Sequence, residues 1–171
     1  ATGALDALLM IPYIVPGIVM GIAFITRFND PPLALTGTGI IIVLAIYVRR
    51  LPYSARSVAA ALKQVGPNLE DAAVSLGYSP GKAFLKVTVP LILPGILAGG
   101  LMSFVTAMNE LSSSLVLYVG RTITMPVRIY LSVMDGEYGT ASALSTILLT
   151  MTVVAVYAAF HLSGRKESAL L

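Results

Sequence analysis

Cysteine is absent from the 171 residues, histidine occurs once, and charged residues make up only 11% of the chain. Without cysteine there is no disulfide framework and no thiolate metal site, and one histidine cannot form a metal cluster alone. Ordinary soluble domains carry roughly 25% charged residues. The low charge therefore argues against a soluble protein, and we expect no metal or cofactor in this chain.

Residue combinations that support catalysis are also missing. An intramembrane enzyme needs paired acids, a histidine-containing metal set or a serine beside a general base, and none of these is visible. Gly37 and Gly39 resemble half of a phosphate-binding loop, but the Lys-Ser or Lys-Thr ending is lacking. The sequence thus predicts that the chain is not an enzyme and does not itself bind ATP.

Apolar residues dominate instead, at 57% of the chain with a mean hydropathy of +0.88. A spanning helix needs about 20 apolar residues, and four blocks approach that length: residues 5–25, 33–48, 87–108 and 141–160. Pro12 and Pro16 should kink the first block, because each removes a backbone donor. We therefore predict an all-α, polytopic membrane bundle of about four spanning helices.

Basic residues are sorted by loop rather than gathered on one face, which argues against nucleic-acid binding. Residues 49–88 hold most of them, namely Arg49, Arg50, Arg56, Lys63, Lys82 and Lys86. By the positive-inside rule this loop is cytoplasmic, and Arg165 and Lys166 place the end of the last block on the same side. The prediction is a multi-pass protein of the bacterial inner membrane with both ends of this segment cytoplasmic.

The segment from 110 to 139 is expected outside the bilayer or partly re-entrant, since its apolar runs are short and interrupted. Glu110 is a candidate for the translocation path because an acid at membrane depth is usually functional. Pairing with Arg121 or Arg128 is the structural alternative. Ser112, Ser113 and Ser114 could line a polar passage or bond helix to helix.

Two short helices are predicted within the cytoplasmic loop. Asn68 reads as an N-cap followed by acids in the first turn, and Gly77 as the residue just past the helix end. Apolar positions recur at helical spacing and form a stripe for a partner, at Leu69, Ala72, Ala73 and Leu76.

A second helix begins with Ser79 as N-cap and Pro80 as its first residue, and it carries Phe84 as a bulky anchor. Together the helices make a rigid unit at the membrane surface that could pass force to the spanning helices. An ordinary loop packed against its own bundle is the alternative.

The segments Asp71-Ala72-Ala73, Gly77 and Val87-Thr88-Val89-Pro90 resemble the family-defining loop of binding-protein-dependent ABC importer permeases. Asp71 stands where that family usually has Glu, so either Glu70 or Asp71 makes the acidic contact with the ATPase. The resemblance implies a docking surface for cytosolic ATP-binding subunits, formed by Leu69, Glu70, Asp71, Ala72, Ala73, Leu76, Gly77, Phe84 and Pro90.

The stretch from Ile11 to Val19 looks like a Pro-Gly segment of iron(III)-type permeases, which implies ferric iron as substrate and polyamine, thiosulfate or phosphonate as alternatives. The family implies a single permease domain over 1–171, the C-terminal part of a longer chain, and a second permease domain, fused or separate. ATP and Mg would be bound by the partner subunit, and an extracytoplasmic binding protein would deliver solute. A channel or secondary carrier, the competing class, should show buried charges or inverted repeats.

Overall fold

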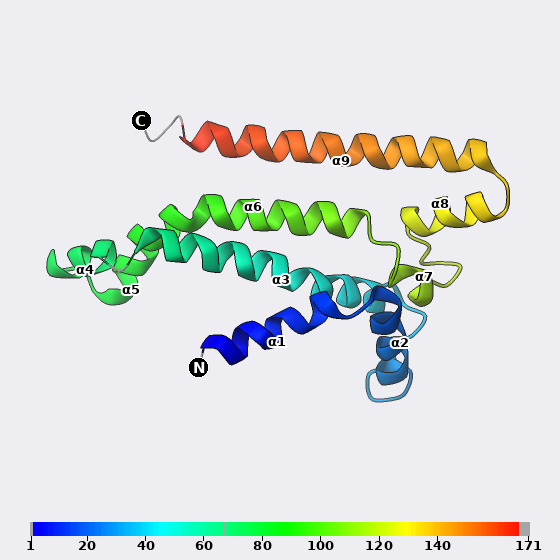
Figure 1. Ribbon diagram of the computed structural model, residues 1–171, viewed down its shortest axis with the longest axis horizontal. Helices are drawn as coiled ribbons and strands as arrows, with labels where there is room; N and C mark the ends of the chain where they lie inside the picture. Colours follow the sequence, from blue (N-terminus) through cyan, green and yellow to red (C-terminus); the bar gives the residue numbers. More distant parts are fainter. Residues whose placement is uncertain (1, 67, 168–171) are drawn as a thin grey trace.

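The computed structural model contains helices joined by turns and coil, and no strand, in the residues it describes, 2–66 and 68–167, with side chains described for 7–66 and 68–161 (Figure 1). This agrees with the all-α prediction. The elements in chain order are α1 (Thr2–Ile14), α2 (Gly17–Phe28), α3 (Gly39–Val65), α4 (Asn68–Ser75), α5 (Pro80–Ala83), the π-helical turn η1 (Phe84–Thr88), α6 (Val89–Met108), α7 (Ser114–Leu117), α8 (Met125–Met134) and α9 (Tyr138–Glu167).

The antiparallel pair α3 and α6 forms the centre of the molecule, with α1 beside α3 and α9 beside α6 (Figure 1). Small residues line the seam between α3 and α6. A Cβ atom on Gly95 would lie 2.5 Å from the Cβ of Ala61, and one on Gly99 would lie 2.6 Å from the Cβ of Ser57. Such residues let two backbones approach closely in a membrane. The expectation for Gly95 and Gly99 is confirmed, whereas Gly100 has nothing within 4 Å.

Serine side chains add hydrogen bonds along the same seam. Ser57 Oγ donates to Gly95 O at 2.6 Å, and Ser54 Oγ and Ser103 Oγ lie 2.9 Å apart. Bonds of this kind between membrane helices contribute about 0.6 kcal/mol each on average. These bonds add to the close backbone contact that holds α3 and α6 together.

The segment Pro80–Met108 is one helix of 29 residues, so α5, η1 and α6 run on without a break. Pro90 has no N–H to donate to the carbonyl four residues earlier. The turn before it widens, and the Val89 N–H bonds to Phe84 O. A single rod thus joins the loop around α4 to the far end of α6.

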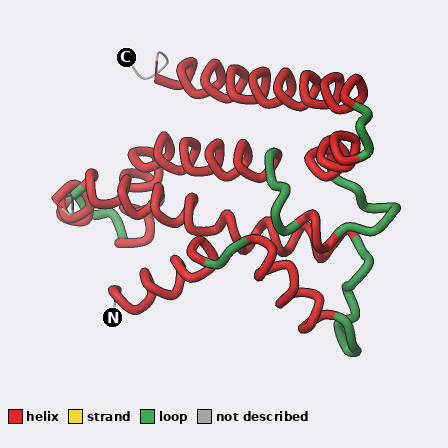
Figure 2. The backbone as a smooth tube through the Cα atoms, turned by 45° about the vertical axis from the view of Figure 1, so that its right-hand side comes forward, coloured by secondary structure: helices red, strands yellow, loops and turns green. Residues whose placement is uncertain are grey.

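The first apolar block is not one kinked spanning helix, which corrects the prediction. Ala7–Ile14 and Gly17–Phe28 differ in direction by 103°. Pro16 is the cause, since it adopts an extended conformation (ψ 140°) and disfavours a helical Val15. Pro12 stays within α1. In Figure 2 the second of these helices turns away from the bundle toward the loop that follows it.

Two helices in the described residues are long and apolar enough to cross a membrane, Pro80–Met108 and Tyr138–His161, or three if α1 and α2 together count as one broken span. The predicted block 33–48, which could extend through Pro52 and Tyr53 toward Leu62, begins later than predicted and does extend. Residues 33–38 are turns and coil, and the helix that begins at Gly39 continues through Arg49, Arg50 and Arg56 to Val65. Because it contains these arginines, α3 is less apolar than the other two helices and is not among the candidate spans.

The loop expected over residues 49–88 is shorter than predicted, because residues 49–65 form the second half of α3. The connection between α3 and α6 is therefore residues 66–88, called the α4–α5 loop below. Residues 110–137 contain the short helices α7 and α8, and α9 begins at Tyr138. Neither α7 nor α8 is long enough to span a bilayer.

Candidate docking and translocation sites

Helix α4 ends as the sequence predicts. Gly77 has a φ of +94°, and its N–H bonds to Val74 O at 2.9 Å, while the Tyr78 N–H bonds to Ala73 O at 3.2 Å. These two bonds are the Schellman pattern that closes helices on a left-handed residue. Asn68, expected as the cap, is the first residue of α4, and Glu70 and Asp71 lie in its first turn.

The surface of the α4–α5 loop is largely apolar and uncovered. Leu76 is 82% exposed, Leu69 49% and Phe84 41%. Ala73 is buried, as is Ala83 of α5, because α4 packs against α5 and η1 through its small residues. The predicted stripe is corrected in one position, since Ala73 faces its own chain while Leu69, Ala72 and Leu76 face outward.

The two acids of α4 have different surroundings. Glu70 is partly buried, and its Oε2 accepts a hydrogen bond from Thr88 Oγ1 at 3.1 Å. Thr88 is itself buried, so this bond ties α4 to the start of the long rod. Asp71 is exposed and makes no side-chain hydrogen bond or ion pair among the described residues. Pro90, also predicted to be in the docking surface, is exposed in the first turn of α6.

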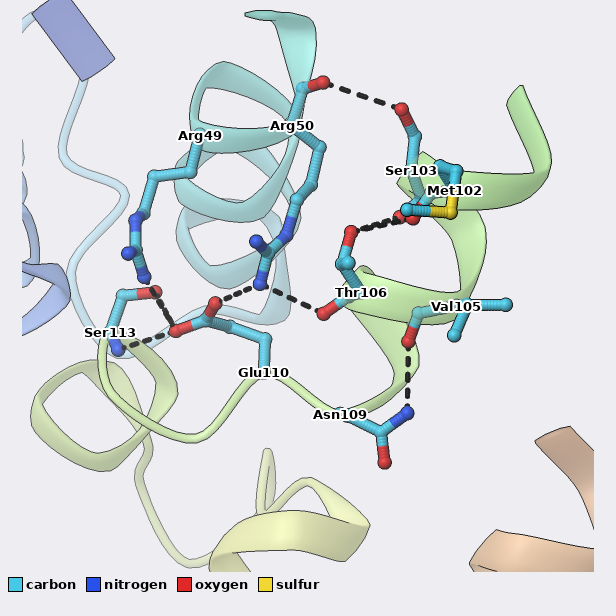
Figure 3. A network of polar contacts seen from close by, with 9 residues as sticks. All are labelled: Arg49, Arg50, Met102, Ser103, Val105, Thr106, Asn109, Glu110 and Ser113. Atoms are coloured by element: carbon cyan, nitrogen blue, oxygen red, sulfur yellow. Dashed lines mark hydrogen bonds and ion pairs between the residues drawn. The ribbon is translucent and has the colours of Figure 1, made fainter. Parts of the chain in front are cut away.

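A buried ion cluster lies where the far end of α6 meets the middle of α3 (Figure 3). Glu110 Oε1 lies 2.7 Å from Arg49 Nη1, and Glu110 Oε2 pairs with Arg50 Nη2. The Glu110 side chain is 4% exposed and each arginine 15%. One carboxylate faces two guanidinium groups, so the cluster carries a net positive charge.

Further hydrogen bonds fix the cluster in place. Glu110 Oε1 accepts from the Ser113 N–H at 3.0 Å and from Ser113 Oγ at 3.1 Å, and Arg50 Nη2 donates to Thr106 O at 2.8 Å. The start of α2 is packed against the same group, since a Cβ on Gly17 would lie 2.4 Å from Arg49 Nη1. The cluster thus joins α3, the end of α6, the α7 segment and the break between α1 and α2.

Two sequence-based assignments are wrong here. Glu110 pairs with Arg49 and Arg50, not with Arg121 or Arg128. Arg49 and Arg50 therefore lie in the middle of α3, inside the bundle and beside the end of α6 that is farther from the α4–α5 loop. Charge sorting placed both arginines in a polar loop because it treats every arginine as water-exposed, whereas in the structure they belong to α3 and pair with a buried acid distant in sequence.

The three serines predicted near Glu110 separate in the structure. Ser113 is fully buried and bonded to Glu110, and Ser114 is fully buried with no partner for its Oγ among the described residues. Ser112 is exposed, and its Cβ lies 2.5 Å from the position of a Cβ on Gly17. Sequence reasoning missed Thr88, Thr106 and Gly17, whose roles depend on contacts across the chain. The two adjacent arginines at the end of an apolar run could have indicated a buried acid as their partner.

Within the described residues, no group of three or more His, Asp or Glu side chains could hold a metal ion. The fold and the sites define a membrane-embedded helical component that exposes an apolar two-helix loop at one end. A family comparison agrees with this class. The chain belongs to the family described as binding-protein-dependent transport system inner membrane component, which matches residues 1–165. It is a permease component, and the ATPase activity of such systems resides in a partner subunit.

Several relatives of the chain are also described as transport system permease proteins. The chain is 37% identical over 152 residues to the ferric transport system permease protein FbpB of Actinobacillus pleuropneumoniae, covering 89% of this chain and 22% of the relative. It is 33% identical over 165 residues to the molybdenum transport system permease protein ModB of Mycobacterium bovis, covering 88% and 62%. A putative 2-aminoethylphosphonate permease, PhnV of Salmonella typhimurium, is 27% identical over 150 residues, covering 88% and 57%. The chain thus spans less than two thirds of each of these relatives.

Proposed function

We propose that the chain forms part of the translocation path of an ATP-driven importer and that its α4–α5 loop docks onto a cytosolic ATP-binding subunit. The observation that carries the proposal is the apolar surface of Leu69, Leu76 and Phe84, which stays exposed at one end of the bundle. Exposed apolar patches of this kind mark interaction sites. The loop is compact and capped at Gly77, as a rigid docking element should be.

Asp71, rather than Glu70, is the acid that contacts the ATPase in this proposal. Glu70 is engaged with Thr88 inside the chain, whereas Asp71 is exposed beside Ala72 on the outward side of α4. Asp71 also stands at the position where the family loop has its Glu.

The path for force in this account follows the rod from Pro80 to Met108. Movement of the α4–α5 loop would shift α6 and, through the small-residue seam, α3. The far end of α6 and the middle of α3 meet in the Glu110 cluster. ATP binding to the partner subunit would therefore change the conformation at the opposite end of the bundle, as alternating access requires.

We further propose four spans over a single permease domain, with α3 and the broken α1–α2 pair counted alongside α6 and α9. Arg49 and Arg50 of α3 pair with Glu110 from another part of the chain, which is how membrane helices accommodate charge. The α4–α5 loop would be cytoplasmic together with both ends of the segment. The side chains of Arg165 and Lys166 lie outside the described residues.

The remaining partners in the proposal are a second permease domain, fused or separate, an extracytoplasmic solute-binding protein and membrane lipid. ATP and Mg belong to the ATP-binding subunit. Ferric iron is the proposed substrate, supported by the 37% identity to a ferric permease. Phosphonate and molybdenum transport are the alternatives with similar relatives, while polyamine and thiosulfate rest on the family resemblance alone.

A matched pair of glycines tests the docking proposal. Gly77 and Gly136 have φ values of +94° and +77°, and neither has an atom within 4 Å of a Cβ. Valine at either position therefore adds strain of about 1–2 kcal/mol without a clash. In the complete transporter, Gly77→Val should weaken co-purification of the ATPase and uncouple hydrolysis from uptake. Gly136→Val, at the opposite end of the bundle, should retain the ATPase. Equal retention in both variants would overturn the proposal.

A further inference from the structure

Helix α3 takes part in two separate packing groups. In its first half, Ile41 and Ile42 belong to a buried apolar cluster with Leu117 of α7 and side chains of α2, and α6 adds none of its described residues to that cluster. In its second half, Ser57 and Ala61 form the seam with α6. We call the first group the α2–α7 body and the second the α3–α6 body; they consist of α2, residues 39–48 and α7, and of residues 53–65 and α6.

The boundary between the two bodies within α3 coincides with Pro52. Proline has no N–H, so Val48 O loses its usual bond inside the helix at this point. Sharp bends in helices occur mostly where a proline removes such a bond. Pro52 is buried, so this weak point lies inside the molecule. Helix α3 is therefore easiest to bend where its packing partners change.

Two further breaks in the chain lie beside the same point. Helix α1 packs along the second half of α3, whereas α2 turns away by 103° and packs on α7. Gly17, the first residue of α2, lies against Arg49 Nη1. Helix α6 ends at Met108, and Glu110 directly after it pairs with Arg49 and Arg50. The two bodies are therefore joined, at three neighbouring places, through a break or a weak point in a helix.

The Glu110 cluster bridges the two bodies at this level. Glu110 accepts hydrogen bonds from Ser113 at the start of α7, and Arg50 donates to Thr106 O in the last turn of α6. Arg49 Nε and Arg50 Nε are buried without a partner among the described residues, which is uncommon for buried donors. Because donors outnumber acceptors, Glu110 can exchange one donor for another and stay paired. Such a contact can hold the bodies at more than one angle.

We propose that Pro52 is a hinge between the α2–α7 body and the α3–α6 body, and that the Glu110 cluster is the brace that fixes its angle. This inference rests on the proposed function and specifies where the chain bends during transport. ATP binding to the partner subunit pulls the α3–α6 body through the α4–α5 loop, and the α2–α7 body turns about Pro52 while the cluster changes its pairing. Ile40 is about 18 Å from Pro52 along α3, so a turn of about 20° moves it by about 6 Å.

Distances between nitroxide spin labels measure this movement. The chain has no cysteine, so pairs of cysteines are introduced into the complete transporter in nanodiscs, after replacement of any cysteine elsewhere. Ile40→Cys with Met102→Cys places one label in each body, and Leu62→Cys with Met102→Cys places both in the α3–α6 body; all three side chains are exposed. Pro52→Ala restores the missing N–H. Pro94→Ala does the same within α6 and is the matched control.

A non-hydrolysable ATP analogue should change the Ile40–Met102 distance by about 6 Å and leave the Leu62–Met102 distance constant. Pro52→Ala should abolish the change, because the restored bond stiffens α3, whereas Pro94→Ala should retain it. A constant Ile40–Met102 distance in a transporter that binds its ATPase, or an equal change in Pro52→Ala, would overturn the hinge.

A second measurement, without nucleotide, does not depend on the ATPase. Glu110→Gln should broaden the distribution of Ile40–Met102 distances, since the brace is weakened, but not that of Leu62–Met102 distances. Adding Pro52→Ala should narrow the distribution again. An unchanged distribution in Glu110→Gln, or equal broadening of both pairs, would refute the brace. Selective broadening in a transporter whose ATPase does not contact the α4–α5 loop would instead contradict the proposed function alone.

Discussion

The Glu110→Gln variant tests the buried ion cluster most sharply. Glutamine keeps the shape of the side chain and a carbonyl oxygen for Ser113, so the main change is the loss of one negative charge. Arg49 and Arg50 would then remain buried together without a counter-charge. Like charges in a poorly hydrated site repel each other and lose hydration at the same time.

The size of the effect follows from the burial of the three groups. Glu110 is 4% exposed and each arginine 15%, so solvent screening is weak. Removing one member of a buried ion pair costs about 3–5 kcal/mol. At about 2–4 °C per kcal/mol for a chain of this size, the lower figure corresponds to a fall in Tm of about 6–12 °C.

The assay is thermal unfolding of the purified transporter in lipid nanodiscs. Asp71→Asn is the matched control, since it removes one carboxylate that is exposed and unpaired among the described residues, and its effect should stay within about 0.5 kcal/mol. Adding Arg50→Met to Glu110→Gln should restore part of the lost stability, because one uncompensated charge is removed. Equal Tm values for Glu110→Gln and Asp71→Asn would refute the buried cluster.

Three further outcomes are expected. Gly99→Leu should destabilise the α3–α6 pair by about 1–3 kcal/mol through overpacking, whereas Gly100→Leu, with open space around it, should leave Tm unchanged. Gly17→Ala should displace Arg49 and lower Tm, but by much less when Glu110→Gln is already present, as a double-mutant cycle would show. Thr88→Val removes the bond to Glu70 and should weaken ATPase co-purification while lowering stability by only about 0.5–1.5 kcal/mol.

Local signals in the sequence were enough to predict the α4–α5 loop. The acids, the glycine and the Ser-Pro start of α5 act within one or two turns, so α4, the left-handed Gly77 and the onset of α5 all appear where the residues predict them. The distribution of exposure on α4 was less predictable, because Ala73 is covered by η1 and α5, which spacing alone does not reveal.

The ion cluster depends on contacts that no local pattern encodes. Arg49 and Arg50 are about sixty residues from Glu110 in the sequence, and only the antiparallel packing of α3 on α6 brings them together. Hydropathy and the positive-inside rule treat each charge by its neighbours in sequence, so both arginines were assigned to a polar loop instead of to the interior of the helix bundle. The break at Pro16 was foreseen as a kink, but its angle is set by where α2 packs.

The identity of the surface that meets the ATPase is the central claim, and site-specific cross-linking measures it directly. Leu76→Cys places a thiol on the most exposed leucine of the α4–α5 loop, and Leu33→Cys places one on a leucine of comparable type, 54% exposed, in the connection between α2 and α3. With a short bifunctional thiol reagent in the assembled transporter, Leu76→Cys should cross-link to the ATP-binding subunit and Leu33→Cys should not. Cross-linking from Leu33→Cys alone, or from neither position in an active complex, would contradict the account.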